Sequence, residues 1–452
     1  MSIPFVGPSY NLSSRPAGIQ RTINMIPVPI EPGNERSSWT FKDVPGLTEF
    51  ADLGAPVRGM EIVAERAFVV AGSTLYELMS DGSFVSRGTL YTSEGFVGMA
   101  GNGPQLAISD ASRIYTLTLT GNLWQSAVFP GRAKIGYLNQ RILFVYRDSQ
   151  QFGWTGLTDA QDIDALDFAS AESSPDNLVG IEIDHLEAFL FGVSTCEPWQ
   201  NTTSTAVFER NSGGISEVGA ASEFSIKKID NSIFWLASTK NGRGAVYRMN
   251  VYQPQRVSTD AIEEKFVGVD LSGASAFTLE YQKNSLYYLN VPGLDTTFVY
   301  DVFSGQWHEW ADFANGEYTQ HRGTCHMYAH GYNLLGSDSG KVYRLDPDSH
   351  QNDGDTLVRD RIMPTSATPY RDRIHPSEFT LDCERGTGGQ VAMRYSIDGG
   401  NNWTSWKTKS LGELGVFNRL VRWRRLASGR DLVVHVRCTD NVPFNPVSGV
   451  AK

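Results

Sequence analysis

A tetrad of residues that recurs along the chain constrains the fold more than any other feature of the sequence. It pairs an apolar residue with an aromatic one and usually ends on an apolar or basic residue. The copies are LYEL at 75–78, IYTL at 114–117, VFER at 207–210, VYRM at 246–249 and VYRL at 342–345, and their starts lie 39, 93, 39 and 96 residues apart. QFGW at 151–154 and FVYD at 298–301 fill the two long gaps. A period of roughly 40 to 50 residues is typical of β-propeller blades.

Each tetrad follows a pattern of two short strands separated by a tight turn, for example VRGMEIVAERAFVVAG from Val57 and SIKKIDNSIFWLAS from Ser225. The second strand of each pair is an apolar run, which indicates burial on both faces. Seven such units occupy positions 57–345. One blade cannot bury both of its faces, whereas blades packed radially cover one another. The pattern therefore predicts an all-β fold with a closed β-propeller of six or seven blades; a large β-sandwich with coincidental spacing is the alternative.

The regions on either side of the repeat differ from it. Positions 1–56 carry prolines at 4, 8, 16, 27, 29, 32 and 45, which leave few backbone donors for a sheet, so we expect an extended N-terminal arm. The propeller is expected over 57–356, ending at the polar segment LDPDSHQNDGD. Alternating strands then predict a small antiparallel β-sandwich domain over 357–452.

Composition excludes some classes of function. The 39 Lys and Arg residues against 50 Asp and Glu give a net charge of −11, which opposes general binding to nucleic acid or anionic membranes. The N-terminus lacks the apolar core of a signal peptide and no run of 18 apolar residues occurs, so neither secretion nor membrane insertion is expected. The four cysteines lack metal-ligand spacing; a disulfide between Cys383 and Cys438 stays open.

The stretch SIDGGNNW at 396–403 matches the Asp-box of sialidase-type propellers. Its flanking apolar residues and its Asp-Gly-Gly-Asn centre favour a β-hairpin turn. In that interpretation Ser396 and Asp398 satisfy backbone groups, Gly400 allows positive φ, and Trp403 folds back over the hairpin. The alternative is a carbohydrate-active propeller, either a sialidase-like glycosidase or a lectin. The stretch lies outside the blade repeat, which weakens that alternative.

No other motif points to catalysis. The sequence contains no G-x-S-x-G elbow, no H-E-x-x-H and no P-loop lysine motif. We therefore predict a protein that is not an enzyme and that has no catalytic residues, cofactor or metal.

The strongest concentration of positive charge is the stretch RLVRWRRLASGR, in which Arg419, Arg422, Arg424 and Arg425 surround Trp423. It predicts a docking edge for acidic protein or for DNA phosphate. An edge strand that its charges protect from aggregation is an equally good interpretation.

The opening segment NLSSRPAGIQRTINMIPVPIEPGNERSSWTFKDVPGLTEF at 11–50, the first hairpin ending in LYEL, and the ending WRRLASGRDLVVHVRC resemble one protein family. This is the family of tail-hub or packaged-DNA-stabilisation proteins of short-tailed bacteriophages, also described as tail accessory or nozzle-like proteins. The resemblance implies a structural virion protein of the tail, assembled in the host bacterial cytoplasm as a homo-oligomer, expected to be a hexamer. It also implies docking under the portal-adaptor, closure of the DNA channel after packaging, transient contact with DNA, and anchoring of a tail spike, fibre or needle.

Overall fold

The computed structural model describes residues 2–3, 5–15, 18–30, 37–126, 129, 131–202, 206–238, 243–367, 372–418 and 420–452. Within these ranges the regular secondary structure is almost entirely β-strand; the helical segments are α1 (Asp260–Lys265) and the 3₁₀ turns η1 (Ser212–Gly214) and η2 (Glu223–Ser225). No helix in the described part of the chain is both long and apolar enough to span a membrane.

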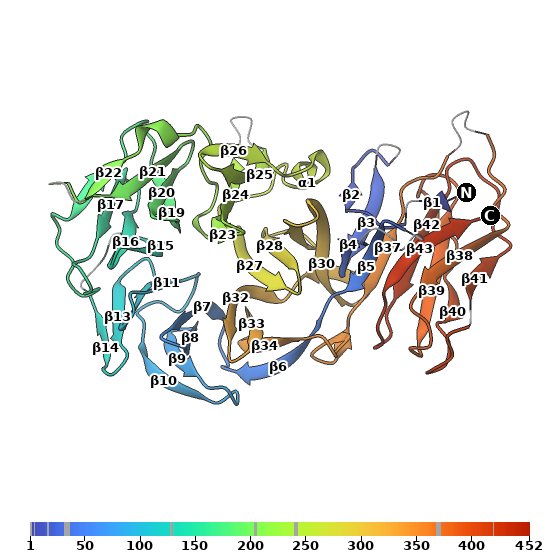
Figure 1. Cartoon of the computed structure of the whole chain (residues 1–452), viewed down its shortest axis with the longest axis horizontal. Helices are drawn as coiled ribbons and strands as arrows, with labels where there is room; N and C mark the ends of the chain where they lie inside the picture. Colours follow the sequence, from blue (N-terminus) through green and yellow to red (C-terminus); the bar gives the residue numbers. More distant parts are fainter. Residues whose placement is uncertain are drawn as a thin grey trace.

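Seven four-stranded antiparallel units follow one another around a ring (Figure 1). Five are separate sheets, and the sixth and seventh are parts of larger sheets. The blades consist of β7 (Val57–Val63), β8 (Arg66–Ala71), β9 (Thr74–Leu78) and β10 (Phe84–Thr89); β11 (Gly98–Gly101), β12 (Gln105–Ser109), β13 (Ile114–Thr118) and β14 (Leu123–Gln125); β15 (Gly131–Leu138), β16 (Arg141–Tyr146), β17 (Gln151–Trp154) and β18 (Phe168–Ser170); β19 (Leu178–Asp184), β20 (Glu187–Gly192), β21 (Cys196–Asn201) and β22 (Phe208–Arg210); β23 (Lys227–Ile229), β24 (Ser232–Ser238), β25 (Gly244–Asn250) and β26 (Gln253–Arg256); β27 (Ser275–Tyr281), β28 (Asn284–Asn290), β29 (Thr297–Asp301) and β30 (Gln306–Ala314); and β32 (Gly323–Ala329), β33 (Tyr332–Ser337) and β34 (Lys341–Asp346) with β6 (Gly46–Asp52).

The innermost strands form a closed circle. Strands β7, β11, β15, β19, β23, β27 and β32 each contact the innermost strand of the next blade, and β32 returns to β7. The fold is thus a seven-bladed β-propeller, which decides between the six and seven blades that the sequence allows. The second strand of each blade is buried, as the apolar runs indicate; Phe234, Trp235 and Leu236 in β24 are 0% exposed.

The turn between the first and second strands repeats with the blades. In six blades it has two residues, and the first of them has positive φ: Ala64, Asn139, His185, Asp230, Gln282 and His330. Two-residue turns of this kind match the right-handed twist of the strands that they join. In these six blades the inner hairpin is therefore defined by residues that are adjacent in the sequence.

One tetrad differs from the predicted repeat. LYEL, IYTL, QFGW, VYRM, FVYD and VYRL all lie on third strands, whereas VFER includes the fourth strand of its blade, β22. The third strand of that blade is β21, which starts at Cys196. Its residues Pro198 and Trp199 replace the usual apolar-aromatic pair, so the fourth blade does not show the tetrad.

The N-terminal segment takes part in sheets, unlike the extended arm that the prolines of positions 1–56 led us to expect. Strand β6 pairs antiparallel with β34 from Asp52–Lys341 to Gly46–Asp346 and completes the seventh blade. Strands β4 (Met25–Pro29) and β5 (Trp39–Asp43) form a two-stranded sheet. The backbone N–H of Ile30 donates to Ser38 across this hairpin. Pro27 and Pro29, at the opposite parity, therefore lack only N–H groups that would point away from β5.

The C-terminal part of the chain forms two facing sheets. One has the order β1–β43–β38–β41, and the other continues as β37–β42–β39–β40. The strands are β1 (Ser2–Ile3), β37 (Arg359–Ile362), β38 (Glu378–Cys383), β39 (Gln390–Ser396), β40 (Lys407–Ser410), β41 (Val421–Arg424), β42 (Val433–Cys438) and β43 (Pro446–Ala451). One apolar cluster fills the space between them and includes Phe379, Trp423, Met393 and Val436. N-terminal residues Phe5, Met25 and Phe41 also belong to this cluster, so both chain ends build the domain.

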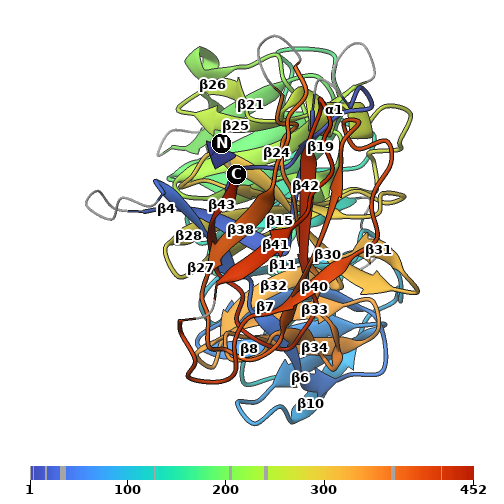
Figure 2. The same cartoon turned by 90° about the vertical axis from the view of Figure 1, so that its right-hand side faces the viewer.

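One sheet runs through both this domain and the propeller. Strand β3 (Ile19–Ile23) pairs with β37 on one side and with β30 of the sixth blade on the other, so an eleven-stranded sheet crosses from the propeller into the C-terminal domain. Strands β2 (Tyr10–Asn11) and β31 (Glu317–Gln320) pair beside it, and β35 (Gln351–Asn352) and β36 (Asp355–Thr356) extend the seventh blade. Viewed from its right-hand side, the molecule presents the strands of the C-terminal domain in front of the propeller (Figure 2).

Candidate functional site

The hairpin turn predicted at SIDGGNNW has the Asp398 carboxylate at its centre. The Asp398 Oδ1 atom accepts hydrogen bonds from the backbone N–H groups of Asn401 and Asn402 at 3.1 and 2.9 Å, and Oδ2 accepts one from the Asn402 amide at 2.6 Å. The Ser396 hydroxyl donates to Oδ1 at 2.6 Å and accepts from the N–H of Gly400 at 2.8 Å. These bonds, the Asn402 N–H first, lower the pKa of Asp398 to about 2. The carboxylate is thus engaged by its own turn.

Gly400 brings the hairpin against the N-terminal segment. Its φ of +88° lies in the left-handed region, and a Cβ atom at this position would stand 2.0 Å from Cδ1 of Ile19. The guanidinium of Arg15 donates a hydrogen bond to the Gly400 carbonyl. The turn therefore contacts the N-terminal segment just before and at the start of β3, the strand that links the two parts of the molecule.

Trp403 begins a ladder of alternating aromatic and guanidinium groups. Cζ of Arg394 lies 4.8 Å from the ring centroid of Trp403 and 4.6 Å from that of Trp406. Cζ of Arg437 lies 4.9 Å from the ring centroid of Trp406 and 5.4 Å from that of Phe313 at the end of β30. Cation–π contacts of this kind stabilise partly buried arginines. Trp403 therefore packs within the C-terminal domain, and Arg437 at the other end of the ladder contacts the sixth blade.

The arginine edge lies on β41, which is an outer strand of its sheet. Trp423 points into the domain core, is 1% exposed and donates from Nε1 to the Lys407 carbonyl at 2.7 Å. Arg422 and Arg424 face the other way and share one carboxylate, with Nη1 and Nε at 3.5 and 3.7 Å from Glu378 Oε2. Two cations beside one anion leave this edge positively charged.

Of the remaining two arginines of the predicted edge, the structure describes Arg425. Arg425 comes after the end of β41 with φ +62°, and its backbone N–H donates to the Ser377 carbonyl, so it does not continue the extended strand. Arg419 lies outside the described residues.

A buried polar cluster, which the sequence analysis missed, joins the C-terminal domain to the propeller. Asp360 on β37 accepts two hydrogen bonds from Arg437, at 2.8 Å to Oδ1 and 2.6 Å to Oδ2, and one from the Tyr318 hydroxyl of β31. Nε2 of His435 lies 3.1 Å from Oδ2. Burial alone would raise the pKa of Asp360, but His435 and Arg437 more than offset it and hold the pKa below its usual value.

The tautomer of His435 follows from its neighbours. Nε of Arg394 donates to Nδ1 of His435 at 3.0 Å, so Nδ1 must carry a lone pair and the proton lies on Nε2, toward Asp360. Burial lowers the pKa of His435 in spite of the nearby carboxylate. The cluster therefore contains a neutral imidazole between an arginine and an aspartate.

The two arginines beside Asp360 bind backbone carbonyls from distant segments. Arg361 donates to the carbonyls of Phe5 and Pro8 at 2.6 and 3.1 Å, and burial lowers its pKa to about 9. Arg359 donates at 2.7 Å both to Asp43 and to the Val442 carbonyl. The alternation Arg-Asp-Arg in a short strand followed by apolar residues is the only sequence signal for this cluster, since its partners lie far away in the chain.

The axis of the propeller contains a cavity of about 300 Å³ lined by the innermost strands. Lys134 and Glu182 form an ion pair of 2.7 Å across adjacent blades. Burial lowers the pKa of Lys134 to about 8, opposed by Glu182, and burial raises the pKa of Glu61 to about 7. A space of this volume has the size of a small-molecule pocket.

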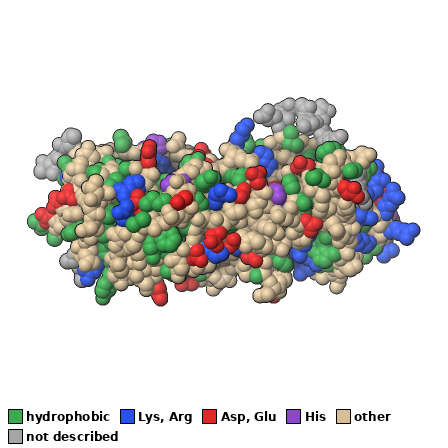
Figure 3. Space-filling model, turned by 90° about the horizontal axis from the view of Figure 1, so that it is seen from below, with side chains coloured by type: hydrophobic (Ala, Val, Ile, Leu, Met, Phe, Trp, Pro, Cys, Tyr) green, Lys and Arg blue, Asp and Glu red, His purple; other side chains and the backbone are tan. Residues whose placement is uncertain are grey.

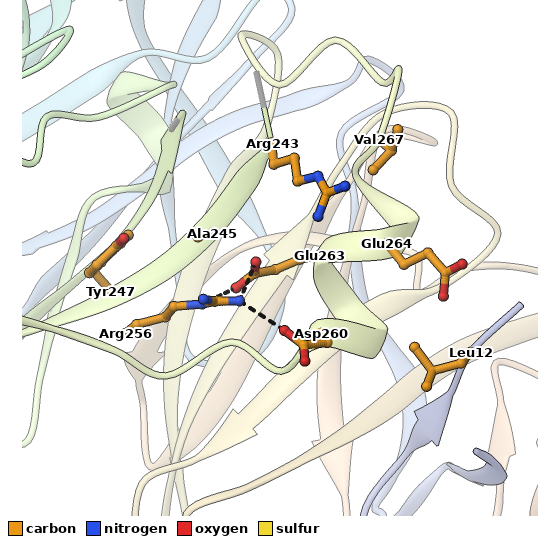
Figure 4. A pocket seen from close by; sticks show the side chains of 9 residues that line it. All are labelled: Leu12, Arg243, Ala245, Tyr247, Arg256, Asp260, Glu263, Glu264 and Val267. Atoms are coloured by element: carbon orange, nitrogen blue, oxygen red, sulfur yellow. Dashed lines mark hydrogen bonds and ion pairs between the residues drawn. The ribbon is translucent and has the colours of Figure 1, made fainter. Parts of the chain in front are cut away.

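A larger groove, of about 810 Å³, lies at the rim of the fifth blade between β25, α1 and the N-terminal segment (Figure 4). Arg256 pairs with Glu263 and, at 3.1 Å, with Asp260 on α1. Leu12 lies on the opposite side, where the backbone N–H of Ser13 donates to Glu264 at 3.0 Å. The charges of this groove are thus largely paired with one another.

The fold and these sites define a seven-bladed β-propeller with an attached β-sandwich domain and a buried polar joint between them. The chain belongs to the phage stabilisation family, because the family model described as "Bacteriophage P22 Gp10, beta-propeller" matches residues 19–350. A curated relative is the tail hub protein gp10 of Salmonella phage P22, which is 24% identical over 442 residues and is aligned over 91% of this chain and 90% of its own length.

Solved structures with a similar arrangement are more distant. The WD40 domain of Neurospora crassa Pan2 is 8% identical with a TM-score of 0.41 and is covered over 95% of its length by 67% of this chain. An exo-β-1,3-galactanase of Phanerochaete chrysosporium is 12% identical with a TM-score of 0.31, covering 80% of this chain and 97% of its own. These scores carry no functional argument, and the propeller assignment stands on the strand order and on the family.

Proposed function

We propose that this chain is a structural protein of the bacteriophage virion, a tail hub or nozzle that docks under the portal-adaptor. There it helps to close the DNA channel after packaging and anchors a tail spike, fibre or needle. The observation that carries the proposal is the similarity to the P22 tail hub protein, which extends over 91% of this chain and includes both of its parts. The protein acts in the virion tail and assembles in the host cytoplasm as a homo-oligomer, expected to be hexameric.

The connection between the propeller and the C-terminal domain supports a role in transmitting mechanical force. One sheet continues from the sixth blade through β3 into the C-terminal domain, and the hydrogen bond from the Tyr318 hydroxyl to Asp360 crosses this boundary. A hub that links an adaptor to an appendage must transmit force without its domains turning against each other. A continuous sheet with buried hydrogen bonds resists such rotation better than a flexible linker does.

The DNA channel is best assigned to the space between subunits. The cavity on the propeller axis is about 300 Å³ and contains the Lys134–Glu182 ion pair, so it has neither the size nor the surface for a duplex. A ring of several copies encloses a wider opening. The net charge of −11 favours passage of DNA through that opening without strong binding to phosphate.

The proposed protein is not an enzyme. The stretch that most resembles a catalytic motif is the Asp-box-like turn, and the Asp398 carboxylate accepts hydrogen bonds from Ser396 and Asn402 within that turn. We therefore expect no release of product from a panel of fluorogenic glycosides and no binding on a glycan array. Clear turnover would favour the carbohydrate-active alternative.

The decisive experiment is symmetry-averaged electron microscopy of the assembled particle, combined with sedimentation of the chain with and without its adaptor. We expect a ring of this chain at the base of the portal-adaptor, and particles that lose their DNA when the chain is missing. A chain that stays monomeric beside the adaptor and is absent from purified particles would contradict the proposal.

A further inference from the structure

We infer that the subunits of the proposed oligomer join head to tail, with the basic end of the C-terminal domain of one copy bound to an acidic loop on the third propeller blade of the next. The basic end comprises Lys409 on β40, the apolar residues of the loop that follows it, and Arg422 and Arg424 on β41. The acidic loop comprises residues 157–168. The inference rests on the proposed self-assembly and adds which surfaces meet.

The basic end combines exposed apolar side chains with positive charge. Leu414, Phe417 and Leu420 in the loop between β40 and β41 are 85%, 67% and 56% exposed. Backbone hydrogen bonds hold the first part of the loop, where Gly415 donates to Gly386 at 3.0 Å and Val416 donates to Glu413 at 2.9 Å. Exposed apolar clusters surrounded by charge are characteristic of protein–protein contact sites.

The acidic loop has the complementary composition. Leu157, Leu166 and Phe168 are 59%, 82% and 40% exposed, and Asp162 and Asp164 lie between them on the surface. Within the described part of the chain no cation forms an ion pair with either aspartate. The loop is also folded back on itself, since Gly156 donates to the Asp162 carbonyl at 2.8 Å.

The net charges of the two parts of the chain have opposite signs, in agreement with the charges of the two surfaces. Residues 357–452 contain 15 Lys and Arg against 9 Asp and Glu, whereas residues 1–356 contain 24 against 41. Lys and Arg side chains gather at the right-hand end of the molecule in Figure 3, over the C-terminal domain, and Asp and Glu side chains lie at the left-hand tip. A second copy of this chain is therefore a partner of the right charge for each end.

The positions of the two surfaces decide the kind of contact. The third and fourth blades and the C-terminal domain lie at opposite ends of the long axis (Figure 1). Contact between two different surfaces of identical subunits is heterologous, and it generates a closed ring when the rotation between neighbours closes. A contact of basic end with basic end would instead bring like charges together and is disfavoured.

Two charge-reversal variants of the full chain test this arrangement. The edge variant carries Arg422→Glu and Arg424→Glu, and the loop variant carries Asp162→Lys and Asp164→Lys. We expect each variant alone to self-associate about 100-fold more weakly than the natural chain, because like charges then face each other at every contact. Sedimentation and native mass spectrometry measure this loss. A variant with Lys42→Glu and Lys283→Glu, two exposed lysines elsewhere, should assemble normally.

Mixing the two variants tests the contact more specifically than measuring each variant alone. The reversed edge of one variant matches the reversed loop of the other, and the two natural surfaces also match, so an equimolar mixture should form rings in which the variants alternate. Combining all four substitutions in one chain should likewise restore assembly. Native mass spectrometry of an isotopically labelled mixture measures the alternation.

The outcomes separate this inference from the proposed function. Normal assembly of either variant, or no recovery on mixing folded variants, would overturn the head-to-tail contact while the natural chain still formed rings in particles. A natural chain that neither self-associates nor enters particles would overturn both. Thermal melting checks folding first, and Lys409→Glu with Arg424→Glu replaces the edge variant if loss of the Arg422–Glu378 ion pair unfolds it.

Discussion

Two strands of this molecule are buried to the same degree, but one consists mainly of apolar side chains and the other mainly of charged ones. In β24 of the fifth blade, the consecutive residues Phe234 and Trp235 are 0% exposed, whereas in β37 at the joint, Arg359, Asp360 and Arg361 are 0%, 2% and 1% exposed. The propeller gains stability from apolar area removed from water, which depends little on direction. The joint uses hydrogen bonds and ion pairs, which fix one orientation of the two parts but lose more when a single partner is removed.

Removal of the Asp360 carboxylate should lower the stability of the protein more than any other substitution considered below. Asp360→Ala leaves Arg437, Tyr318 and His435 without their common acceptor, and we expect a loss of about 3–5 kcal/mol in the free energy of unfolding. Urea denaturation followed by tryptophan fluorescence measures this loss. Asp295→Ala, at a 66% exposed side chain 4.0 Å from Arg21, should cost less than about 1 kcal/mol. A similar cost for both variants would mean that the joint is not more sensitive than the surface.

A substitution in β6, the strand that closes the propeller, should have the next largest effect on stability. Leu47 on β6 is 1% exposed and packs in the cluster shared by the sixth and seventh blades. Leu47→Ala should lower the free energy of unfolding by about 2–4 kcal/mol, since it leaves a cavity among apolar neighbours. Hydrogen exchange should show the gain in exchange rate concentrated in β6 and β34. Uniform faster exchange in all blades would contradict a local role in closure.

The hairpin turn should have an intermediate effect on stability and none on catalysis. Asp398→Ala removes the acceptor for the N–H groups of Asn401 and Asn402, and Trp403→Ala removes a ring that packs on Arg394. We expect each substitution to cost about 1–4 kcal/mol in thermal or urea unfolding. Glu413→Ala, at an exposed position of the same domain, serves as the control. A variant as stable as the natural chain would remove the structural interpretation of this turn.

The smallest expected effect, of opposite sign, concerns His308 in β30. It is 0% exposed, and no described group forms a hydrogen bond with either ring nitrogen. Burial lowers its pKa to about 3, so the folded state keeps it neutral while the unfolded chain, with a pKa near 6.5, takes up a proton. Stability is therefore complete above about pH 6.5 and falls as the pH decreases toward 3. His308→Leu should raise stability by about 1 kcal/mol at pH 7.

The pH dependence is the more specific readout for this variant. Removal of His308 should reduce the slope of unfolding free energy against pH by up to about 1.4 kcal/mol per pH unit between pH 3 and 6.5. Urea unfolding at several pH values measures the slope. An unchanged slope would mean that this histidine does not titrate on unfolding.

The extent to which the sequence predicted the fold depends on how local each signal is. The blades were predictable because six of the seven inner hairpins repeat the same turn, as at Ala64 and at Asp230, and the second strands are buried. The fourth blade was misaligned, because Pro198 and Trp199 replace its tetrad. The closing strand β6 was assigned to an arm, since its partner Lys341–Asp346 lies almost three hundred residues further along the chain.

The candidate sites were likewise predictable only where their residues lie close together in the sequence. The bonds of Asp398 were predictable because donor and acceptor lie within four residues of each other. The cluster around Asp360 was not, since Tyr318 and Arg437 come from segments 42 and 77 residues away. A single sequence contains no local pattern that brings such groups together. The arginines of β41 indicated that this strand lies at the edge of a sheet, but no sequence pattern indicated the exposed apolar loop beside it.

The closure of the seventh blade also sets an order of events during protein synthesis. Strand β6 leaves the ribosome early, whereas β34, with which it pairs, is complete only after residue 346 has been added. The first blades must therefore wait as an open row with one free edge until about three quarters of the polypeptide exists. A nascent chain interrupted before that point has no ring, and its unpaired edge strand is free to associate with another unfinished copy.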